Sequence, residues 1–173
     1  MSTYRRRTRV RAPLEEVWAF HSTTDGLEAL TPDWMGLEVE SVRGPDGESD
    51  PDELVAGSEI SMRSKPFGLL PESRWLSRIT ERREGEGYCM FRDDMLGGPF
   101  ELWIHTHEMY GDGTETVLID TVEYELPAGP LGDRLDPAAV VGFEPMFRYR
   151  HRKTKELLED NGPPSETQAA TPE

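Results

Sequence analysis

The chain has 173 residues, which is enough for one domain with a hydrophobic core. Its 34 acidic residues outnumber 19 basic ones and give a formal net charge of −15, which argues against nucleic-acid binding because phosphate contacts need a basic surface. No apolar run is long enough to span a membrane, and the arginine-rich N-terminus lacks the apolar segment of a secretory signal. We therefore expect a cytoplasmic protein that does not insert stably into membranes.

Within residues 3–11, arginine occupies every second position from Arg5 to Arg11, an alternation that is typical of a strand with one charged face. Such a row of arginines could also indicate nucleic-acid binding, but a structural explanation fits the acidic chain better. We expect this strand to lie beside the last strand of the sheet, with Arg7 or Arg9 near Glu123 or Glu125, because opposite charges pair across neighbouring strands.

Two short helices are predicted after this strand. Pro13 suits the first turn of a helix, and the apolar residues that follow it at helical spacing end at His21. Asp25 can cap a second helix over residues 26–30. Pro32 ends that helix, because the residue before a proline disfavours the helical conformation.

Alternating apolar and polar residues predict a series of strands in the middle of the chain, separated by turns rich in glycine and proline. These strands are expected over residues 37–42, 53–64, 73–81 and 88–94.

Residues 99–127 read as two long strands joined by a turn at Asp112-Gly113. A two-residue loop and a four-residue loop centred on this turn give the same pairing. Both place His105 directly opposite Asp120 and predict a hydrogen bond between them.

One face of this hairpin carries the aromatic rings, and we take it as the inner face, since side chains alternate along a strand. Its polar groups allow three interpretations: a structural cluster, a polar anchor for a ligand in an apolar cavity, and a metal site or catalytic base. The metal signal is weak, because the His-x-His pair and Asp120 are the only ligands that can be named. The inner face consists of Trp103, His105, His107, Met109, Leu118, Asp120, Val122, Tyr124 and Leu126.

A long C-terminal helix is predicted to begin at Asp136-Pro137 and to run towards Asp160, with Pro145 kinking or restarting it. The basic residues between positions 148 and 155 complement the negative end of the helix dipole. We therefore interpret that basic cluster as structural.

The expected order is one strand, two short helices, six strands and one long helix. Hairpin-linked strands with helices to one side are typical of an α+β fold. We therefore predict a curved, antiparallel, seven-stranded sheet wrapped around the long C-terminal helix, with a cavity between them. This single domain spans residues 1–160, and residues 161–173 are expected to form a disordered acidic tail.

A series of short motifs runs through this order of elements. They are the opening Ala12-Pro13-Leu14-Glu15-Glu16-Val17-Trp18-Ala19-Phe20, then Leu30-Thr31-Pro32, Trp75 with Ile79, Phe91 with Asp93, Gly98-Pro99-Phe100, Trp103-x-His105-x-His107, Asp120-x-Val122-x-Tyr124 and Leu126-Pro127. These motifs resemble the START-like, or SRPBCC, superfamily, and within it the polyketide cyclase/dehydrase-like and ligand-binding prokaryotic proteins. The resemblance implies a helix-grip fold with a cavity for an apolar ligand, but it implies no particular reaction.

The function that this resemblance favours is binding of a hydrophobic small molecule, such as a lipid, an isoprenoid or a polyketide-like compound. Neither a cofactor nor a metal is expected, and the protein is expected to be a monomer or a homodimer. The expected ligand-binding residues are Trp75, Phe91, Asp93, Trp103, His105, His107, Met109, Asp120, Tyr124 and Phe147.

The alternative is an enzyme of the cyclase, dehydratase or isomerase type. In that case His105 or His107 is the general base, Asp120 orients it, and Tyr124 donates a hydrogen bond to a developing oxyanion. A third class, the interaction module, is known among proteins of this fold but has no support in the sequence.

The composition also predicts a dependence on salt. Lys65, Lys153 and Lys155 are the only lysines, and an acidic chain that uses arginine in place of lysine resembles the proteins of salt-accumulating halophiles. The other explanation is an ordinary acidic protein from a GC-rich genome. We favour the halophile explanation.

Potassium chloride should therefore raise the melting temperature. Repulsion among the excess carboxylates weakens as the Debye length falls from about 10 Å at 0.1 M salt to about 3 Å at 1 M. Thermal unfolding followed by circular dichroism over this range measures the effect. A melting temperature that stays constant or falls would contradict the halophile explanation.

Overall fold

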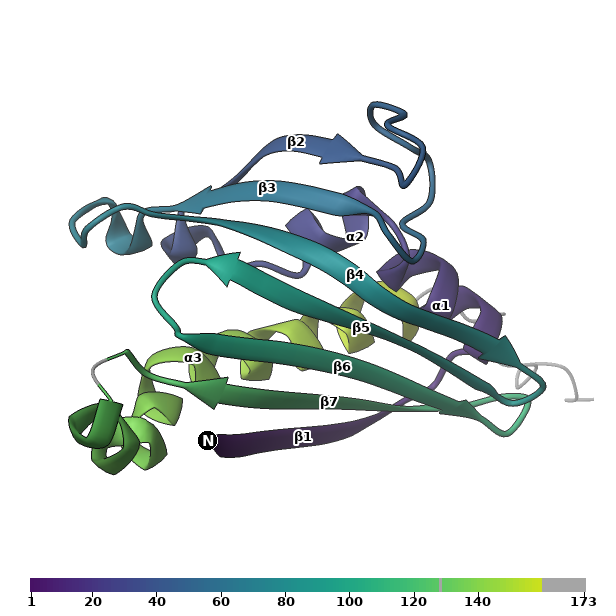
Figure 1. Cartoon of the computed structure of the whole chain (residues 1–173). Coiled ribbons are helices and arrows are strands. Elements are labelled where there is room, and N and C mark those ends of the chain that lie inside the picture. The colour runs from purple at the N-terminus through teal and green to yellow at the C-terminus, as the bar shows by residue number, and fades with distance from the viewer. Residues whose placement is uncertain (128, 160–173) are drawn as a thin grey trace, which may run out of the picture.

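The computed structural model describes residues 1–127 and 129–159 (Figure 1). The end of the predicted domain at residue 160 and the predicted tail over residues 161–173 lie outside these described residues. Seven strands form one antiparallel sheet in the order β1-β7-β6-β5-β4-β3-β2, which confirms the predicted α+β fold. The strands are β1 (Ser2–Val10), β2 (Leu37–Arg43), β3 (Glu59–Ser64), β4 (Ser73–Gly85), β5 (Tyr88–Gly97), β6 (Leu102–Gly111) and β7 (Thr116–Glu125).

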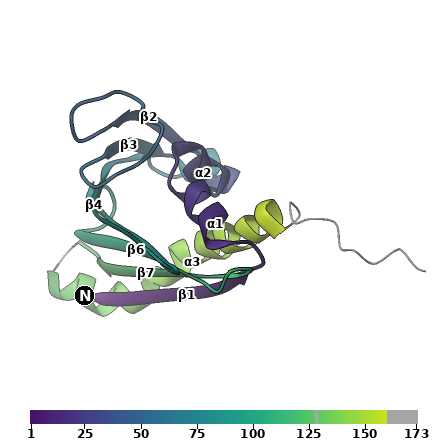
Figure 2. The ribbon, with the colours of Figure 1, turned by 90° about the vertical axis from the view of Figure 1, so that its right-hand side faces the viewer.

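The helices lie on one side of this curved sheet. The long helix α3 (Gly129–Glu159) runs along the sheet. The short helix α2 (Thr24–Ala29) lies near β2 and β3, and α1 (Leu14–His21) lies between α2 and α3 (Figures 1 and 2). Two single 3₁₀ turns, η1 (Asp33–Met35) and η2 (Pro66–Gly68), lie in the connections. Among the described residues, none of the helices is both long enough and apolar enough to cross a membrane.

The register of the β6–β7 hairpin differs from the prediction by two residues. His107, rather than His105, lies directly opposite Asp120. Because side chains alternate with a period of two, this shift leaves every residue on the face that was predicted for it. The assignment of the inner face is confirmed, since Trp103 and Tyr124 are both buried.

The cause of the shift lies in the turn. The carboxylate of Asp112 accepts hydrogen bonds from the backbone N–H groups of Thr114 and Glu115, at 3.3 and 3.0 Å. This side-chain cap fixes a four-residue loop over residues 112–115, and Gly111 pairs with Thr116.

Strand β1 lies beside β7, as predicted. The expected arginine partners are wrong, because Arg7 lies opposite Ile119 and the guanidinium of Arg9 pairs with Glu115 at 2.8 Å. Neither of them pairs with Glu123 or Glu125, the partners that the sequence suggested.

A buried hydrogen bond aligns these two strands. The hydroxyl of Thr116 at the start of β7 donates to the backbone carbonyl of Ala12, just beyond the end of β1, at 2.8 Å. This contact places the arginines beside the first half of β7, and Thr3 lies opposite Glu123.

Several element boundaries also differ from the predictions. The strand expected over residues 53–64 begins only at Glu59. The side chain of Ser58 accepts a hydrogen bond from the backbone N–H of Val55 at 3.0 Å, and such local bonds compete with strand pairing.

Helix α2 begins earlier than predicted because Thr23, rather than Asp25, is its N-cap. The hydroxyl of Thr23 accepts a hydrogen bond from the backbone N–H of Gly26 at 3.1 Å. At the other end of the chain, α3 starts before Asp136, and Pro145 does not divide it. Pro130 suits the first turn of a helix for the same reason that favoured Pro137.

Candidate functional site

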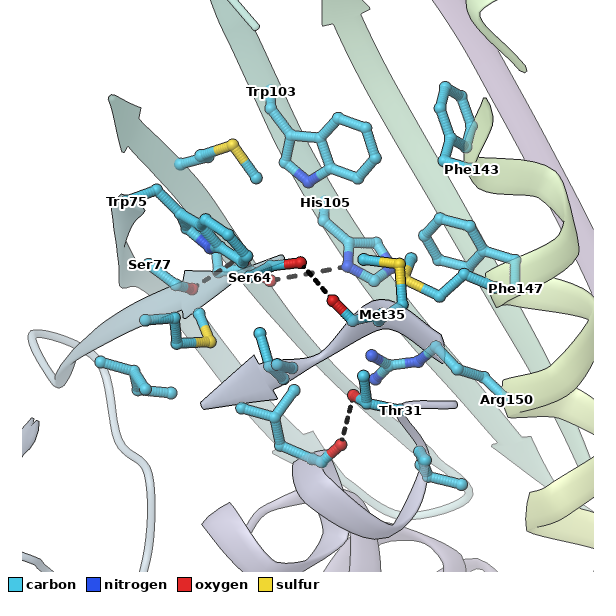
Figure 3. Close-up of a pocket in the computed structure, with 18 of the residues that line it drawn as sticks. Thr31, Met35, Ser64, Trp75, Ser77, Trp103, His105, Phe143, Phe147 and Arg150 are labelled. Atoms are coloured by element: carbon cyan, nitrogen blue, oxygen red, sulfur yellow. Dashed lines mark hydrogen bonds and ion pairs between the residues drawn. The ribbon is translucent and has the colours of Figure 1, made fainter. Parts of the chain in front are cut away.

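A cavity of about 390 Å³ lies between the inner face of the sheet, α2 and α3 (Figure 3). This volume falls within the range of small-molecule pockets. Most of its lining side chains are apolar or aromatic, whereas the ionisable ones gather where β5 and β6 face α3. The apolar wall includes Leu30, Ile60, Met62, Trp75, Trp103 and Phe147.

All four histidines of the chain are buried at this polar corner. His105 and His107 come from β6, His21 from α1 and His151 from α3. The ring centroids of His105 and His107 are 3.8 Å apart, and the ring of His21 lies 6.5 Å from that of His107. Four imidazoles from three separate elements therefore share one region of the core.

The carboxylate of Asp120 on β7 holds this cluster together, and its side chain is almost fully buried. Its Oδ1 lies 3.0 Å from Nε2 of His105, and its Oδ2 lies 2.5 Å from Nε2 of His151. An ionised carboxylate only accepts hydrogen bonds, so both imidazoles donate. Nδ1 of His107 lies 2.7 Å from the same Oδ1 without hydrogen-bond geometry, so this contact is electrostatic.

The charges in the cluster follow from these contacts. Burial favours the neutral form of Asp120, yet the imidazoles of His107, His105 and His151 hold the pKa of its carboxyl well below the ordinary value. Burial and the neighbouring ring of His105 hold the pKa of His107 well below its ordinary value. Burial lowers the pKa of His21 to about 4. At neutral pH, Asp120 is therefore an anion, and His21 and His107 are neutral imidazoles.

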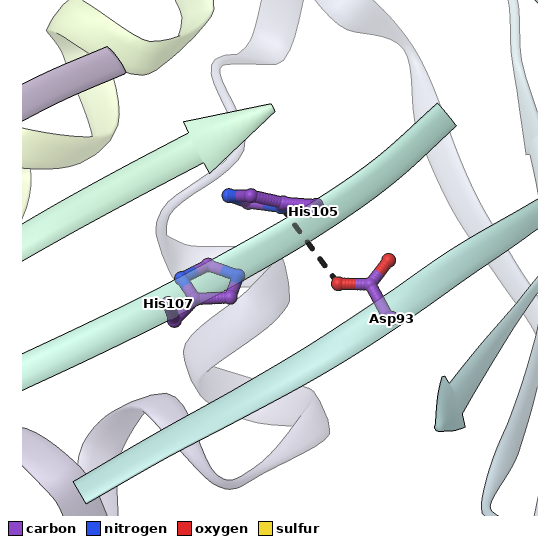
Figure 4. Close-up of side chains that lie close together, drawn as sticks. All are labelled: Asp93, His105 and His107. Carbon is purple, nitrogen blue, oxygen red and sulfur yellow. Dashed lines mark ion pairs between the residues drawn. The ribbon is translucent and has the colours of Figure 1, made fainter. Parts of the chain in front are cut away.

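Asp93 on β5 is the second carboxyl of the corner and lines the cavity (Figure 4). Its Oδ2 accepts a hydrogen bond from the hydroxyl of Ser77 at 3.0 Å, and its Oδ1 lies 3.7 Å from Nδ1 of His105. Burial raises the pKa of Asp93, although His105 and the Ser77 hydrogen bond oppose that shift. Since His105 donates its Nε2–H to Asp120, a neutral ring directs the lone pair of Nδ1 towards Asp93.

Asp93, His105 and His107 could together hold a metal ion, since their ligand atoms all lie within 4.8 Å of one another. Two histidines and one carboxylate suit a divalent transition metal. Two ligands of one such ion, with bonds of about 2.1 Å, lie at most about 4.2 Å apart. The three side chains would have to move closer together to bind such an ion.

Arg150 brings a positive charge to the cavity. Figure 3 shows its side chain projecting from α3 into the cavity, on the helix side that also carries Phe147. Burial lowers the pKa of Arg150, whereas Asp120 and Asp93 favour its charged form. A guanidinium remains protonated at neutral pH.

No protein-family model and no curated protein matches the chain, but solved structures match nearly all of it. A protein from Thermus thermophilus has 19% identity and a TM-score of 0.62, over 92% of this chain and 98% of that one. Norcoclaurine synthase from Thalictrum flavum, solved with dopamine and hydroxybenzaldehyde, has 16% identity and a TM-score of 0.64, over 94% and 89%. The aromatase/cyclase Zhui from a Streptomyces species has 14% identity and a TM-score of 0.64, over 91% and 93%.

The chain shares the helix-grip fold of these solved structures. The resemblance that its sequence motifs indicated is thus confirmed at the level of the fold. In this helix-grip structure, the predicted hydrogen bond between His105 and Asp120 is also present, although it runs diagonally across the hairpin.

Most of the side chains that the sequence predicted for the site line the cavity of the helix-grip fold. Met109, Asp120 and Tyr124 do not, because they lie in the core behind the cavity wall. Met109 packs beside α1, and Tyr124 packs against Phe143 of α3. The predicted residues that line the cavity are Trp75, Phe91, Asp93, Trp103, His105, His107 and Phe147.

Sequence reasoning missed three residues of the corner, namely His21, His151 and Arg150. A signal was present for the first two, because each histidine continues an apolar stripe of its helix. Arg150 was assigned to the basic cluster at the end of α3. Only its place between Phe147 and Thr154 on the buried side of the helix distinguishes it from the exposed basic residues nearby.

Replacing Asp120 with alanine should destabilise the protein by about 3 kcal/mol or more. The change leaves the N–H donors of His105 and His151 buried without their acceptor, at about 1–3 kcal/mol each. Urea unfolding measures the loss, and Asp46→Ala in an exposed loop is the matched control. A loss below about 1 kcal/mol would show that the imidazoles find other partners and that Asp120 does not organise the cluster.

Proposed function

We propose that this chain binds a hydrophobic small molecule, such as a lipid, an isoprenoid or a polyketide-like compound, in the cavity between the sheet and α3. The observation that carries this proposal is a cavity of about 390 Å³ with an apolar wall and one ionisable corner. Ligand pockets combine these features, because apolar walls supply affinity and a few polar groups fix orientation. The likeness to norcoclaurine synthase, solved with two small aromatic molecules, supports the same use of the fold.

The connection between β3 and β4 offers a route to the cavity. Leu70 lines the cavity and is 51% exposed, and Leu69 beside it is 87% exposed. Phe67 is 64% exposed, and its ring stacks on Trp34 of η1 at 5.2 Å between centroids. An apolar rim of this kind lowers the cost of moving a hydrophobic molecule from water into the protein.

Filling the cavity tests the proposal. Leu37 on β2 lines the cavity, whereas its neighbour Glu38 points to solvent. Leu37→Trp should reduce binding of the uncharged dye N-phenyl-1-naphthylamine by about tenfold or more, because the added ring occupies the ligand volume. Fluorescence titration measures the affinity, and Glu38→Trp adds the same ring outside as a control.

Native mass spectrometry of freshly purified protein provides the second measurement. Wild type should carry an additional small-molecule mass that Leu37→Trp loses and Glu38→Trp retains. If wild type carries no such mass and binds no dye, the proposed function is wrong.

A second candidate function, proton transfer on a carbonyl substrate, is favoured by the position of His105. Its Nδ1 faces the cavity corner beside Asp93, while its Nε2–H is held by Asp120. In this proposal Nδ1 accepts the proton of a C–H group next to a carbonyl, and Asp120 stabilises the resulting imidazolium. The electron pair of the C–H bond forms the C=C bond of an enolate, and the π pair of the carbonyl moves to its oxygen. Tyr124, the donor suggested by the sequence, lies outside the cavity wall and has no part in this proposal.

Deuterium exchange tests this candidate. With 1-tetralone in D₂O, wild type should speed incorporation of deuterium beside the carbonyl, and His105→Gln should abolish the increase while retaining dye binding. Proton NMR follows the exchange. If wild type does not exceed the buffer rate, proton transfer on this class of ketone is refuted and ligand binding is unaffected.

A further inference from the structure

We infer that Arg150 binds the carboxylate of a monoanionic ligand whose apolar body fills the cavity. This inference rests on the proposed binding function and adds the chemistry of the ligand's polar end. Arg150 lies at the boundary between the ionisable corner and the apolar wall, so a carboxylate placed there directs the rest of the molecule along the wall.

The first argument is the unpaired charge of Arg150. Among the described residues, its guanidinium forms neither a hydrogen bond nor an ion pair with another side chain. Asp120 and Asp93 act on it only through their longer-range fields. A cation removed from bulk water is unfavourable unless it gains an ionic or hydrogen-bonding partner. A carboxylate suits the planar guanidinium, because it accepts two parallel hydrogen bonds from it.

The second argument is that most of the hydroxyl donors of the cavity are already used. Thr31 donates to the carbonyl of Leu27 at 2.8 Å, Ser64 to that of Met35 at 2.7 Å, and Ser77 to Asp93 at 3.0 Å. The hydroxyl of Thr23 likewise donates to a backbone carbonyl, at 3.2 Å. Of the hydroxyls lining the cavity, only that of Ser73 lacks an acceptor among the described residues, as do the indole N–H groups of Trp75 and Trp103. These remaining donors are neutral, whereas the guanidinium of Arg150 is charged and forms stronger hydrogen bonds. A ligand with an acceptor group therefore finds its strongest donor at Arg150.

The third argument limits the ligand to one negative charge. A single guanidinium neutralises a single carboxylate, and the anion of Asp120 lies close behind the cavity wall. The whole chain also carries a formal charge of −15. A phosphate monoester, with nearly two negative charges at neutral pH, would meet stronger repulsion from these groups than a carboxylate does.

Matched pairs of ligands test the inference with the protein freed of bound lipid. Dodecanoate and 1-dodecanol share an alkyl chain, while 2-naphthoate and 2-naphthalenemethanol share an aromatic body. Displacement of N-phenyl-1-naphthylamine measures all four affinities. Wild type should bind at least one carboxylate about tenfold or more tightly than its alcohol, the effect of a charged hydrogen-bonded pair. Comparing the affinities for dodecanoate and 2-naphthoate then shows whether the cavity prefers a fatty acid or an aromatic acid.

Variants of two arginines on the same helix then locate the effect. Arg150→Gln should remove the preference for carboxylate and leave the affinity for the alcohol unchanged. Arg152→Gln is the control, because Arg152 is 66% exposed and pairs with Glu156 on the outer side of α3. It removes the same charge without altering the cavity, so it should retain the preference.

The outcomes separate this inference from the proposed function. Equal affinity of wild type for carboxylates and alcohols, or a preference that survives Arg150→Gln, overturns the role of Arg150. Failure of wild type to bind the dye and all four ligands overturns the proposed function itself. If Arg150→Gln does not fold, Arg150→Lys replaces it and should weaken the preference, since lysine keeps the charge but lacks the planar pair of donors. An unchanged preference in Arg150→Lys would then contradict the paired hydrogen bonds.

Discussion

A carboxylate buried in an apolar core must be surrounded by donors, and in this protein Asp120 meets that requirement with imidazoles from two directions. His105 on β6 and His151 on α3 both donate to it. One side chain of β7 thereby connects the neighbouring strand to the helix that the sheet encloses. A hydrogen bond that bridges sheet and helix also fixes their relative position, because its strength falls steeply with distance and angle. The same interaction therefore stabilises the fold and shapes the corner of the cavity.

The hydrogen bonds of Asp120 explain why one end of the cavity carries ionisable side chains and the other is mostly apolar. The ionisable groups are concentrated near β5, β6 and α3, beside the Asp120 cluster, so the remaining wall is mostly apolar, with hydroxyls as its polar groups. Phe147 is fully buried in that wall, and its ring meets the ring of His105 edge-on at 5.0 Å between centroids. With Phe147 fixed against the sheet, the helix carries Arg150, three residues further on, to the edge of the cavity.

The sequence was sufficient to predict the order of elements, the neighbour of β1 and the inner face of the hairpin, because each depends on alternation or on local turn residues. It was insufficient for the register, since a shift by two residues preserves every face and only the cap made by Asp112 distinguishes the alternatives. The contact of Asp120 with His151 on α3 could not be predicted from the sequence either. Contact between residues 120 and 151 depends on how a helix is positioned over a sheet, and helical spacing alone does not specify that position.

The two aspartates beside His105 have pKa values shifted in opposite directions, because their surroundings differ although the residue type is the same. Asp120 is surrounded by imidazole donors and remains an anion, whereas Asp93 has one hydroxyl donor and a burial that raises its pKa. His105 lies between them, with a different ring nitrogen towards each. The fixed anion therefore lies behind the wall, and the carboxyl that more readily holds a proton faces the cavity. A ligand at this corner meets the cation of Arg150, which favours a ligand whose polar end accepts hydrogen bonds.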